Sequence, residues 1–248
     1  MKNLRLRLTY NGAAYHGWQI QDNANTVQDE IEKAVEKVFG AHLTVYGCSR
    51  TDAHVHANEY YCNFRTEKNL PCDTVVRAVN AYLPFDIAVT RCDEVPLSFH
   101  SRFDCVSKEY IYRVWNSSVR NPFFTDTAYH YKYKLDEKLL DASSKDYIGM
   151  HDFGAFCSSG SSVGSTVRTV KNFSVTRNGD TVIFTVEADG FLYNMVRIMV
   201  GTLININEGK IGRDDITDII LSADRNRAGV TAPPEGLFLN KVRYKVGE

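Results

Sequence analysis

The sequence predicts an α+β fold of two similar lobes that share a mostly antiparallel sheet with flanking helices. In both halves of the chain, segments with period-two alternation of apolar and polar residues are interleaved with segments of helical period. Asn178-Gly179, between two alternating segments, is a strong hairpin signal. No low-complexity linker separates the halves, which favours a shared sheet or a tight interface. We expect an N-terminal lobe of residues 1–104 and a C-terminal lobe of residues 105–248.

The first half is predicted to begin with a half-buried strand, because leucines at positions 4, 6 and 8 alternate with arginines. Asn11-Gly12 marks a turn, and Thr26 is a good N-cap for a helix that ends at Gly40. A short buried strand is expected around Leu43 and Val45, and a second helix over residues 74–83. Further strands are indicated by apolar residues that share a face, namely Tyr60, Cys62 and Phe64, then residues 87–89, then Tyr110, Tyr112 and Val114.

The second half continues in the same style. A helix is expected from Asp136 to about Ser144, and a serine-rich loop covers residues 158–162. The hairpin joins strands at 170–175 and 182–186. A long helix from Phe191, a short helix near residues 214–221 and a last strand over residues 237–244 complete the chain.

Composition limits the class of protein. The 248 residues are 44% hydrophobic and 24% charged, which is ordinary for a soluble globular protein. The net charge of -1 gives no support by itself to a polyanionic partner, although a basic cleft can lie on a neutral molecule. The six cysteines form no C-x-x-C pair and are expected to be reduced thiols. The N-terminus has no signal-peptide pattern, and residues 190–206 are too few and too polar for a membrane span, so we expect a cytoplasmic protein.

The segment from Cys48 to Ala57 concentrates chemically active side chains between two predicted strands. If the segment were extended, Asp52, His54 and His56 would share one face, a pattern that could begin a zinc or iron site. The alternative is that the histidines are hydrogen-bonded structural residues, which we prefer for His56. Asp52 beside Arg50 is either a surface ion pair of little consequence or a partly buried carboxylate that needs a cation. A carboxylate kept ionised in this way can act as a nucleophile or a general base.

The same segment carries a resemblance to a known family. Arg50-Thr51-Asp52-Ala53-His54-Val55-His56-Ala57 resembles the R-T-D-A-G-V-H-A motif of the TruA family of tRNA pseudouridine synthases. Further similar motifs follow in the family's order along nearly the whole chain. They are Tyr10-Asn11-Gly12-Ala13-Ala14-Tyr15-His16-Gly17-Trp18-Gln19-Ile20-Gln21, Leu83-Pro84-Phe85-Asp86-Ile87, Phe99-His100-Ser101-Arg102, Lys108-Glu109-Tyr110-Ile111-Tyr112, His151-Asp152-Phe153, Val167-Arg168-Thr169-Val170, Phe191-Leu192-Tyr193-Asn194-Met195-Val196-Arg197 and Ala232-Pro233-Pro234-Glu235-Gly236-Leu237.

The resemblance implies the pseudouridine synthase fold, with an active cleft between the lobes, and an isomerase that needs no metal or nucleotide cofactor. A uridine base is detached from its ribose, turned over and rejoined through C5. By resemblance, Asp52 is the essential catalyst, Tyr110 lies against the base and is suited to proton transfer at C5, and Arg197 pairs with the aspartate. Without the resemblance, Tyr110 would be interpreted as a core aromatic. An arginine on the apolar side of the predicted helix 191–203 needs an anionic partner in any case, unless its side chain reaches solvent.

The resemblance also implies the substrate and the assembly. The target is tRNA, at positions 38 to 40 of the anticodon arm, and the protein is a homodimer in which one tRNA contacts both subunits. Leu237 is expected to pack on the base, with an ordinary core leucine as the alternative. The target base must leave its stack, and phosphate contacts help to offset that cost. Candidates for such contacts, each equally well a solvated surface charge, are Arg50, Arg102, Lys108 and Arg168.

Three positions depart from the family pattern. Ser49 stands where glycine is common, and Asn11 stands where aspartate is common. His54 replaces the motif glycine two residues after Asp52, a position where glycine permits a positive φ, and histidine tolerates positive φ better than most residues. Because Asp52, Tyr110 and Arg197 are all present, we expect activity to be kept. Two alternatives stay open: a tRNA-binding protein whose chemistry is weakened through His54, and a metal-dependent hydrolase that uses Asp52, His54 and His56.

Overall fold

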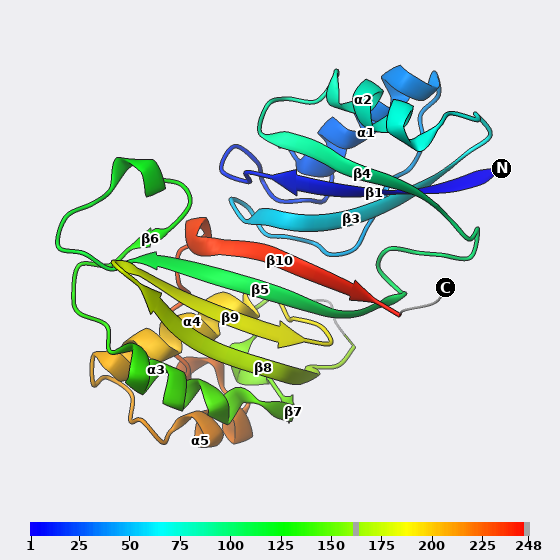
Figure 1. Ribbon diagram of the computed structural model, residues 1–248. Helices are drawn as coiled ribbons and strands as arrows, with labels where there is room; N and C mark the ends of the chain where they lie inside the picture. The colour runs from blue at the N-terminus through cyan, green and yellow to red at the C-terminus, as the bar shows by residue number, and fades with distance from the viewer. Residues whose placement is uncertain (161–163, 246–248) are drawn as a thin grey trace. The chain divides into compact units, whose positions relative to one another are not determined.

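The computed structural model describes residues 1–160 and 164–245, which form two compact units (Figure 1). The first unit comprises residues 1–106 together with the C-terminal segment from Phe238, and the second comprises residues 107–237. The chain crosses between the units within β5 (Cys105–Trp115) and at the start of β10 (Leu237–Tyr244). Each unit contains mostly antiparallel strands with flanking helices, so the predicted α+β class is confirmed. The division into functional lobes at 104/105 stays a prediction.

The sheet of the first unit has the order β4-β1-β3-β10. Strand β1 (Lys2–Tyr10) pairs antiparallel with β3 (His56–Thr66) and β4 (Ile87–Val95), β10 runs parallel to β3, and the two-residue β2 (Tyr46–Gly47) also pairs with β3. Helices α1 (Val27–Phe39) and α2 (Cys72–Asn80) lie together on one face of the sheet (Figure 1).

The core of the first unit follows from the predicted period-two faces. In the register of β1 against β3, Leu4 is opposite Phe64, Leu6 opposite Cys62, and Leu8 opposite Tyr60. All six side chains are 0–1% exposed. The two alternating segments recognised in the sequence therefore form one buried layer, and it positions the start of β3, where the Asp52 motif ends.

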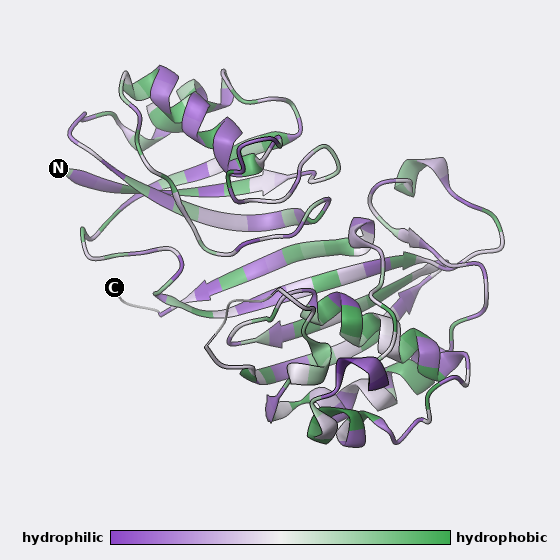
Figure 2. Ribbon diagram, turned by 180° about the vertical axis from the view of Figure 1, so that it is seen from behind, coloured by the Kyte–Doolittle hydropathy of each residue, from purple (hydrophilic) through white to green (hydrophobic). Residues whose placement is uncertain are grey.

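Both predicted ends of α1 are confirmed. Thr26 is the N-cap, and its hydroxyl accepts a hydrogen bond from the amide of Asp29. Gly40 ends the helix in the left-handed conformation with φ 74°, as expected for a glycine after the last turn. Figure 2 shows hydrophilic and hydrophobic stretches alternating along this helix and the strands, as amphipathic elements require.

The sheet of the second unit has the order β5-β9-β8-β7. Strands β5, β9 (Thr181–Ala188), β8 (Val167–Asn178) and β7 (Gly149–Asp152) are antiparallel neighbours, and β6 (Tyr129–His130) runs parallel to β5. The predicted hairpin joins β8 to β9, with Gly179 at φ 57°. The helices are α3 (Glu137–Ser144), α4 (Met195–Asn207) and α5 (Ile216–Ser222), and α4 is buried along nearly its whole length. Short 3₁₀ turns occur at Pro122–Phe124, Lys145–Tyr147, Gly154–Phe156, Arg225–Arg227 and Pro234–Gly236.

Some predicted boundaries were wrong. Helix α4 begins at Met195 rather than Phe191, because Asn194 has φ 61°, a left-handed conformation that a helix cannot include. The strand expected around Leu43 and Val45 is reduced to the two-residue β2, which begins just after Val45. Ser161 and Ser162 of the predicted serine-rich loop lie outside the described residues. Over residues 1–160 and 164–245, no helix combines the length and apolar character that crossing a bilayer demands.

Candidate active site

Asp52, the carboxylate of the segment from Cys48 to Ala57, lies on a tight turn. The amide of Val55 donates to the carbonyl of Asp52 at 3.2 Å, and His54, the third residue of this four-residue turn, has φ 64°. A positive φ at this place is what a type II turn requires, which explains why glycine is favoured there. The segment is therefore not extended, and the condition under which Asp52, His54 and His56 would share one face is not met.

A second loop holds this turn through backbone contacts. The amide of His54 donates to the carbonyl of Tyr15 at 3.0 Å, and the amide of Trp18 donates to the carbonyl of Thr51 at 3.1 Å. A methyl group on Gly17, which has φ 89°, would lie 2.5 Å from the Thr51 oxygen. A methyl group on Gly12 would lie 2.0 Å from the carbonyl oxygen of Val55. Only glycine permits the two loops to approach so closely, so residues 12–18 and 51–55 form one fixed structure.

The two histidines of the motif have separate structural roles. The Nδ1 atom of His54 lies 2.8 Å from the carbonyl oxygen of Ala13, and the side chain is exposed. His56 is fully buried, its Nδ1 accepts from the amide of Gly12 at 2.9 Å, and its ring stacks on Phe238 at 4.4 Å. Within residues 1–160 and 164–245 there is no group of three or more His, Cys, Asp or Glu side chains suited to hold a metal ion. The preferred interpretation of His56 as a structural residue agrees with its contacts.

The residues just before Asp52 are anchored on aromatic side chains. The ring of Tyr60 stacks on Trp18 at 4.1 Å, and its hydroxyl donates to the carbonyl of Ser49. Burial holds the pKa of Tyr60 well above its usual range, so this hydroxyl keeps its proton. The buried hydroxyls of Thr51 and Tyr10 share a hydrogen bond of 2.9 Å. These contacts fix Ser49 and Thr51, the residues on either side of Arg50.

Two of the predicted substrate-binding residues meet in a pocket of the first unit. Arg50 and Arg102 both line a cavity of about 200 Å³. Its other lining residues include several rings, Trp18, Tyr46, His100 and Phe103. The ring of His100 lies 5.1 Å from Tyr46 and 4.4 Å from Phe103, and the Arg102 guanidinium lies 5.8 Å above Phe103. Guanidinium groups next to exposed aromatic rings are suited to bind phosphates and unstacked bases.

Sequence reasoning did not identify the aromatic part of this pocket. Tyr46 is 43% exposed and Phe103 is 75% exposed, and exposure of a large aromatic residue cannot be read from local pattern. Burial lowers the pKa of His100, which favours its neutral form. In that form its Nδ1 accepts a hydrogen bond from the amide of Arg102 at 3.1 Å, which ties Arg102 to the pocket.

The second unit holds Tyr110 and Arg197. Tyr110 lies on β5, is 6% exposed, and packs edge-on against Phe191 with ring centroids 5.0 Å apart. Arg197 lies in the first turn of α4, where its Nε donates to the carbonyl of Ala232 and its Nη1 donates to the side-chain oxygen of Asn194, both at 2.7 Å. The left-handed Asn194 that delays the start of α4 thus also orients the guanidinium of Arg197.

The segment 232–236 of the second unit connects Arg197 and β5 to Leu237. The amide of Ala232 donates to the carbonyl of Arg197, and the carbonyl of Pro233 accepts from the Tyr112 hydroxyl at 2.7 Å. A methyl group on Gly236 would lie 2.8 Å from the Tyr112 ring, so the chain passes tightly over β5 just before Leu237. Leu237 is 5% exposed.

The remaining predicted contacts lie on strands of the second unit. Lys108 is a partly buried residue of β5, opposite Ala188 of β9. Arg168, on β8, donates from its Nη1 to the carbonyl of Ser165 at 3.0 Å, and its guanidinium lies against Gly190. The structure thus places Arg50, Asp52 and Arg102 in the first unit and Lys108, Tyr110, Arg168, Arg197 and Leu237 in the second.

Comparisons with known proteins agree on one family. A family model described as tRNA pseudouridine synthase matches residues 8–104 and 144–245. The tRNA pseudouridine synthase A of Thermoanaerobacter sp. (strain X514) is 43% identical over 244 residues, which is 98% of this chain and 100% of the relative. The protein of the same name from Acetivibrio thermocellus is 44% identical over 244 residues with the same coverage of both chains. The tRNA pseudouridine synthase A 2 of Clostridium tetani is 43% identical over 98% of this chain and 99% of the relative.

A solved structure shows a weaker similarity. The chain aligns with a crystal structure of a Cbf5-Nop10-Gar1 complex at a TM-score of 0.36 and 11% identity, covering 79% of this chain and 52% of that chain. This similarity is too low to support an inference about fold or function.

The positive φ of His54 predicts the effect of substitutions there. We expect the free energy of unfolding of His54→Gly to lie within about 1 kcal/mol of the wild-type value. Relief of the strain at the left-handed backbone position offsets the lost contact with Ala13 and the added entropy of the unfolded chain. His54→Ala keeps the strained φ and loses the contact, so it should be destabilised by about 1–2 kcal/mol. Urea denaturation of the three proteins measures both differences. Equal stability of the glycine and alanine variants would contradict the assigned turn.

Proposed function

The chain belongs to the tRNA pseudouridine synthase family, and from this premise we propose that it isomerises uridines at positions 38 to 40 of the tRNA anticodon arm. The family establishes an isomerase that converts uridine to pseudouridine. The target positions are proposed from the resemblance of the motifs. The observation that carries the proposal is the Asp52 turn, which has a positive φ at His54, the position where the family motif has glycine.

We propose Asp52, Tyr110 and Arg197 as the catalytic residues. The reaction breaks the bond between C1′ of the ribose and N1 of the base and forms a bond between C1′ and C5. The proton of C5 is released and N1 takes up a proton, so the product is an isomer of the substrate. A carboxylate at position 52 can support bond cleavage as a nucleophile or as a base. A phenol hydroxyl at position 110 is suited to accept or relay the C5 proton. The guanidinium of Arg197 is oriented by Asn194 and Ala232, and by resemblance it is the cation that pairs with the catalytic carboxylate.

We propose that phosphates and the target base are bound by Arg50, Arg102, Lys108, Arg168 and Leu237. Flipping a base out of its stack costs a few kcal/mol, and contacts to rings and phosphates offset this cost. The pocket lined by Arg50, Arg102 and exposed aromatic rings has the chemistry for such contacts. The apolar side chain of Leu237, carried by a tightly packed segment, is suited to lie against the face of a base.

The two alternatives find no support in the local geometry. With His54 at a positive φ, the turn has its hydrogen bond from Val55 to Asp52, so the histidine does not prevent the turn from forming. Asp52, His54 and His56 do not form a line on one face, and His56 already uses its Nδ1 for the amide of Gly12. A metal-dependent hydrolase would need these three groups to converge.

Replacement of the catalytic carboxylate tests the proposal. Asp52→Asn should reduce tritium release from tRNA with C5-tritiated uridine by about 10³-fold or more, because the amide cannot act as nucleophile or base. The wild type should release tritium in buffer with EDTA.

The matched control is Asp22→Asn, which neutralises an exposed carboxylate outside the motif and should keep full activity. Binding of Asp52→Asn to tRNA should be retained. Turnover by Asp52→Asn would exclude this residue as the catalyst.

A pair of tyrosine variants tests the role of Tyr110. Tyr110→Phe should strongly slow tritium release at saturating tRNA, because the ring is kept and the proton-carrying hydroxyl is lost. Tyr112→Phe removes a buried hydroxyl whose partner is the carbonyl of Pro233, so it should cost about 1 kcal/mol of stability and leave the isomerisation rate intact. Equal rates for the two variants would argue against proton transfer by Tyr110.

We also propose that the protein is a cytoplasmic homodimer in which one tRNA contacts both subunits, as the family resemblance implies. Light scattering after size exclusion should give a mass of twice 28.1 kDa. Binding titrations should give one tRNA for each pair of chains at low tRNA concentration. A monomeric mass for the active protein would contradict this assembly.

A further inference from the structure

A second cavity lies in the second unit, and none of the proposed catalytic or substrate-binding residues lines it. It has a volume of about 380 Å³. Its lining comes from the segment after β5, the segment before α3, α3 itself and β8, and consists of Asn116, Ser117, Ser118, Lys132, Lys134, Glu137 and Arg177. Three cationic side chains and one carboxylate therefore surround it, together with two hydroxyls.

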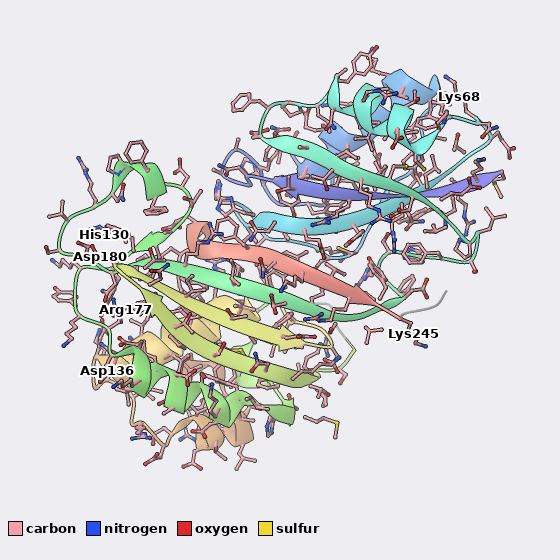
Figure 3. The ribbon with its side chains drawn as sticks, in the orientation of Figure 1. Lys68, His130, Asp136, Arg177, Asp180 and Lys245 are labelled. Carbon is pink, nitrogen blue, oxygen red and sulfur yellow. The ribbon has the colours of Figure 1, made fainter. Side chains whose placement is uncertain are left out.

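Arg177 and Glu137, two of the lining residues, form an ion pair and neutralise each other. The Nε of Arg177 donates to Glu137 at 2.9 Å, and its Nη2 donates to the side-chain oxygen of Asn116 at 3.0 Å and to the carbonyl of Leu135 at 2.7 Å. The hydrogen bond from Arg177 lowers the pKa of Glu137. Figure 3 shows Arg177 near the tip of the β8–β9 hairpin, with Asp180 at the tip and Asp136 at the start of α3. Asp136 caps α3 by accepting from two amides, and neither aspartate lines the cavity.

The two lysines are the uncompensated charges. Lys132 and Lys134 are exposed, and neither forms an ion pair with any residue in the described part of the chain. Lys132 Nζ lies 5.1 Å from the ring centroid of Tyr133, which is 61% exposed. Two ammonium groups at one pocket, with an exposed ring on the residue between them, match the pattern of nucleic-acid surfaces, where phosphates meet cations and bases stack on rings.

Asn116 holds the segment that carries the two lysines in place. The side-chain nitrogen of Asn116 donates to the carbonyls of Tyr131 at 2.9 Å and Tyr133 at 2.6 Å, and its side-chain oxygen accepts from the amide of Leu135 at 3.2 Å. Asn116 is the residue that follows β5, so the lysine segment is fixed to the sheet at three points. A pocket whose cations are positioned before binding loses less entropy when a ligand arrives.

We propose that this pocket binds backbone phosphates of the tRNA through Lys132 and Lys134, with a neighbouring base on Tyr133. The proposal rests on the proposed function, because it takes tRNA as the ligand, and it adds a contact site remote in sequence from the catalytic motif. Lysine is depleted at the centre of protein–protein interfaces, which favours RNA over a protein partner here.

The test measures binding of the full chain to a tRNA transcript over a range of salt concentrations. Lys132→Ala/Lys134→Ala should weaken binding about 10-fold at about 0.15 M salt and reduce the slope of log affinity against log salt by about 2. The rate at saturating tRNA should stay within about twofold, since these residues hold the substrate and do not react. Lys132→Glu/Lys134→Glu should weaken binding further, and circular dichroism should show both variants folded.

A matched double variant controls for net charge. Lys138→Ala/Lys171→Ala removes two exposed lysines of the same unit that do not line the pocket, and should change the affinity less than about twofold. Tyr133→Ala should weaken binding about fivefold and Tyr133→Phe should not, because stacking needs only the ring.

Three results would overturn the proposal. The first is an affinity of Lys132→Ala/Lys134→Ala no lower than that of the control pair. The second is thermal stabilisation by inorganic phosphate that needs the two lysines while tRNA affinity does not, which would identify a small-anion site. The third is a change of oligomeric mass in the lysine variant, which would assign the pocket to a protein interface. Absence of tritium release by the wild type, with lysine-dependent tRNA binding, would instead reject the proposed reaction and keep the binding site.

Discussion

The candidate site depends on the close contact between the backbones of residues 12–18 and 51–55. Hydrogen bonds from His54 to Tyr15 and from Trp18 to Thr51 join the two loops, and Gly12 and Gly17 leave no room for a side chain between them. The contact fixes the path of the chain on both sides of Asp52. A carboxylate on a turn of this kind is positioned by backbone atoms, which makes its location insensitive to changes in exposed side chains.

The second unit positions its candidate site residues through local hydrogen bonds and close packing. Arg197 is oriented by the side chain of Asn194 and the carbonyl of Ala232, and the segment that contains Ala232 then packs over Tyr112 toward Leu237. Asn194 tolerates a left-handed φ better than most residues, and that conformation both delays α4 and directs its amide at Arg197. The irregular start of the helix is therefore part of the candidate site.

Much of the fold could be predicted from sequence because the deciding signals are local. The paired faces of Leu4, Leu6 and Leu8, the cap at Thr26 and the last strand were all correct to within a residue or two. The start of α4 was missed because the conformation of Asn194 is imposed by its neighbours in space and has no counterpart in the apolar pattern. The positive φ of His54 was anticipated only through the family glycine. The cluster of Tyr46, His100 and Phe103 joins Tyr46 to two residues more than 50 positions further along the chain, and it gave no signal in any window of sequence.

The near-zero net charge of the chain is compatible with binding a polyanion, because some of its cationic side chains form ion pairs and others do not. Several cationic side chains form ion pairs within the protein, such as Arg5 with Asp93 and Arg177 with Glu137. Such paired groups fix structure and contribute little to a distant ligand, since each presents a dipole rather than a charge. The cations that remain, such as Lys132 and Lys134, decide the local field. The proposed tRNA contact therefore depends on the unpaired cations at this pocket and not on the overall charge.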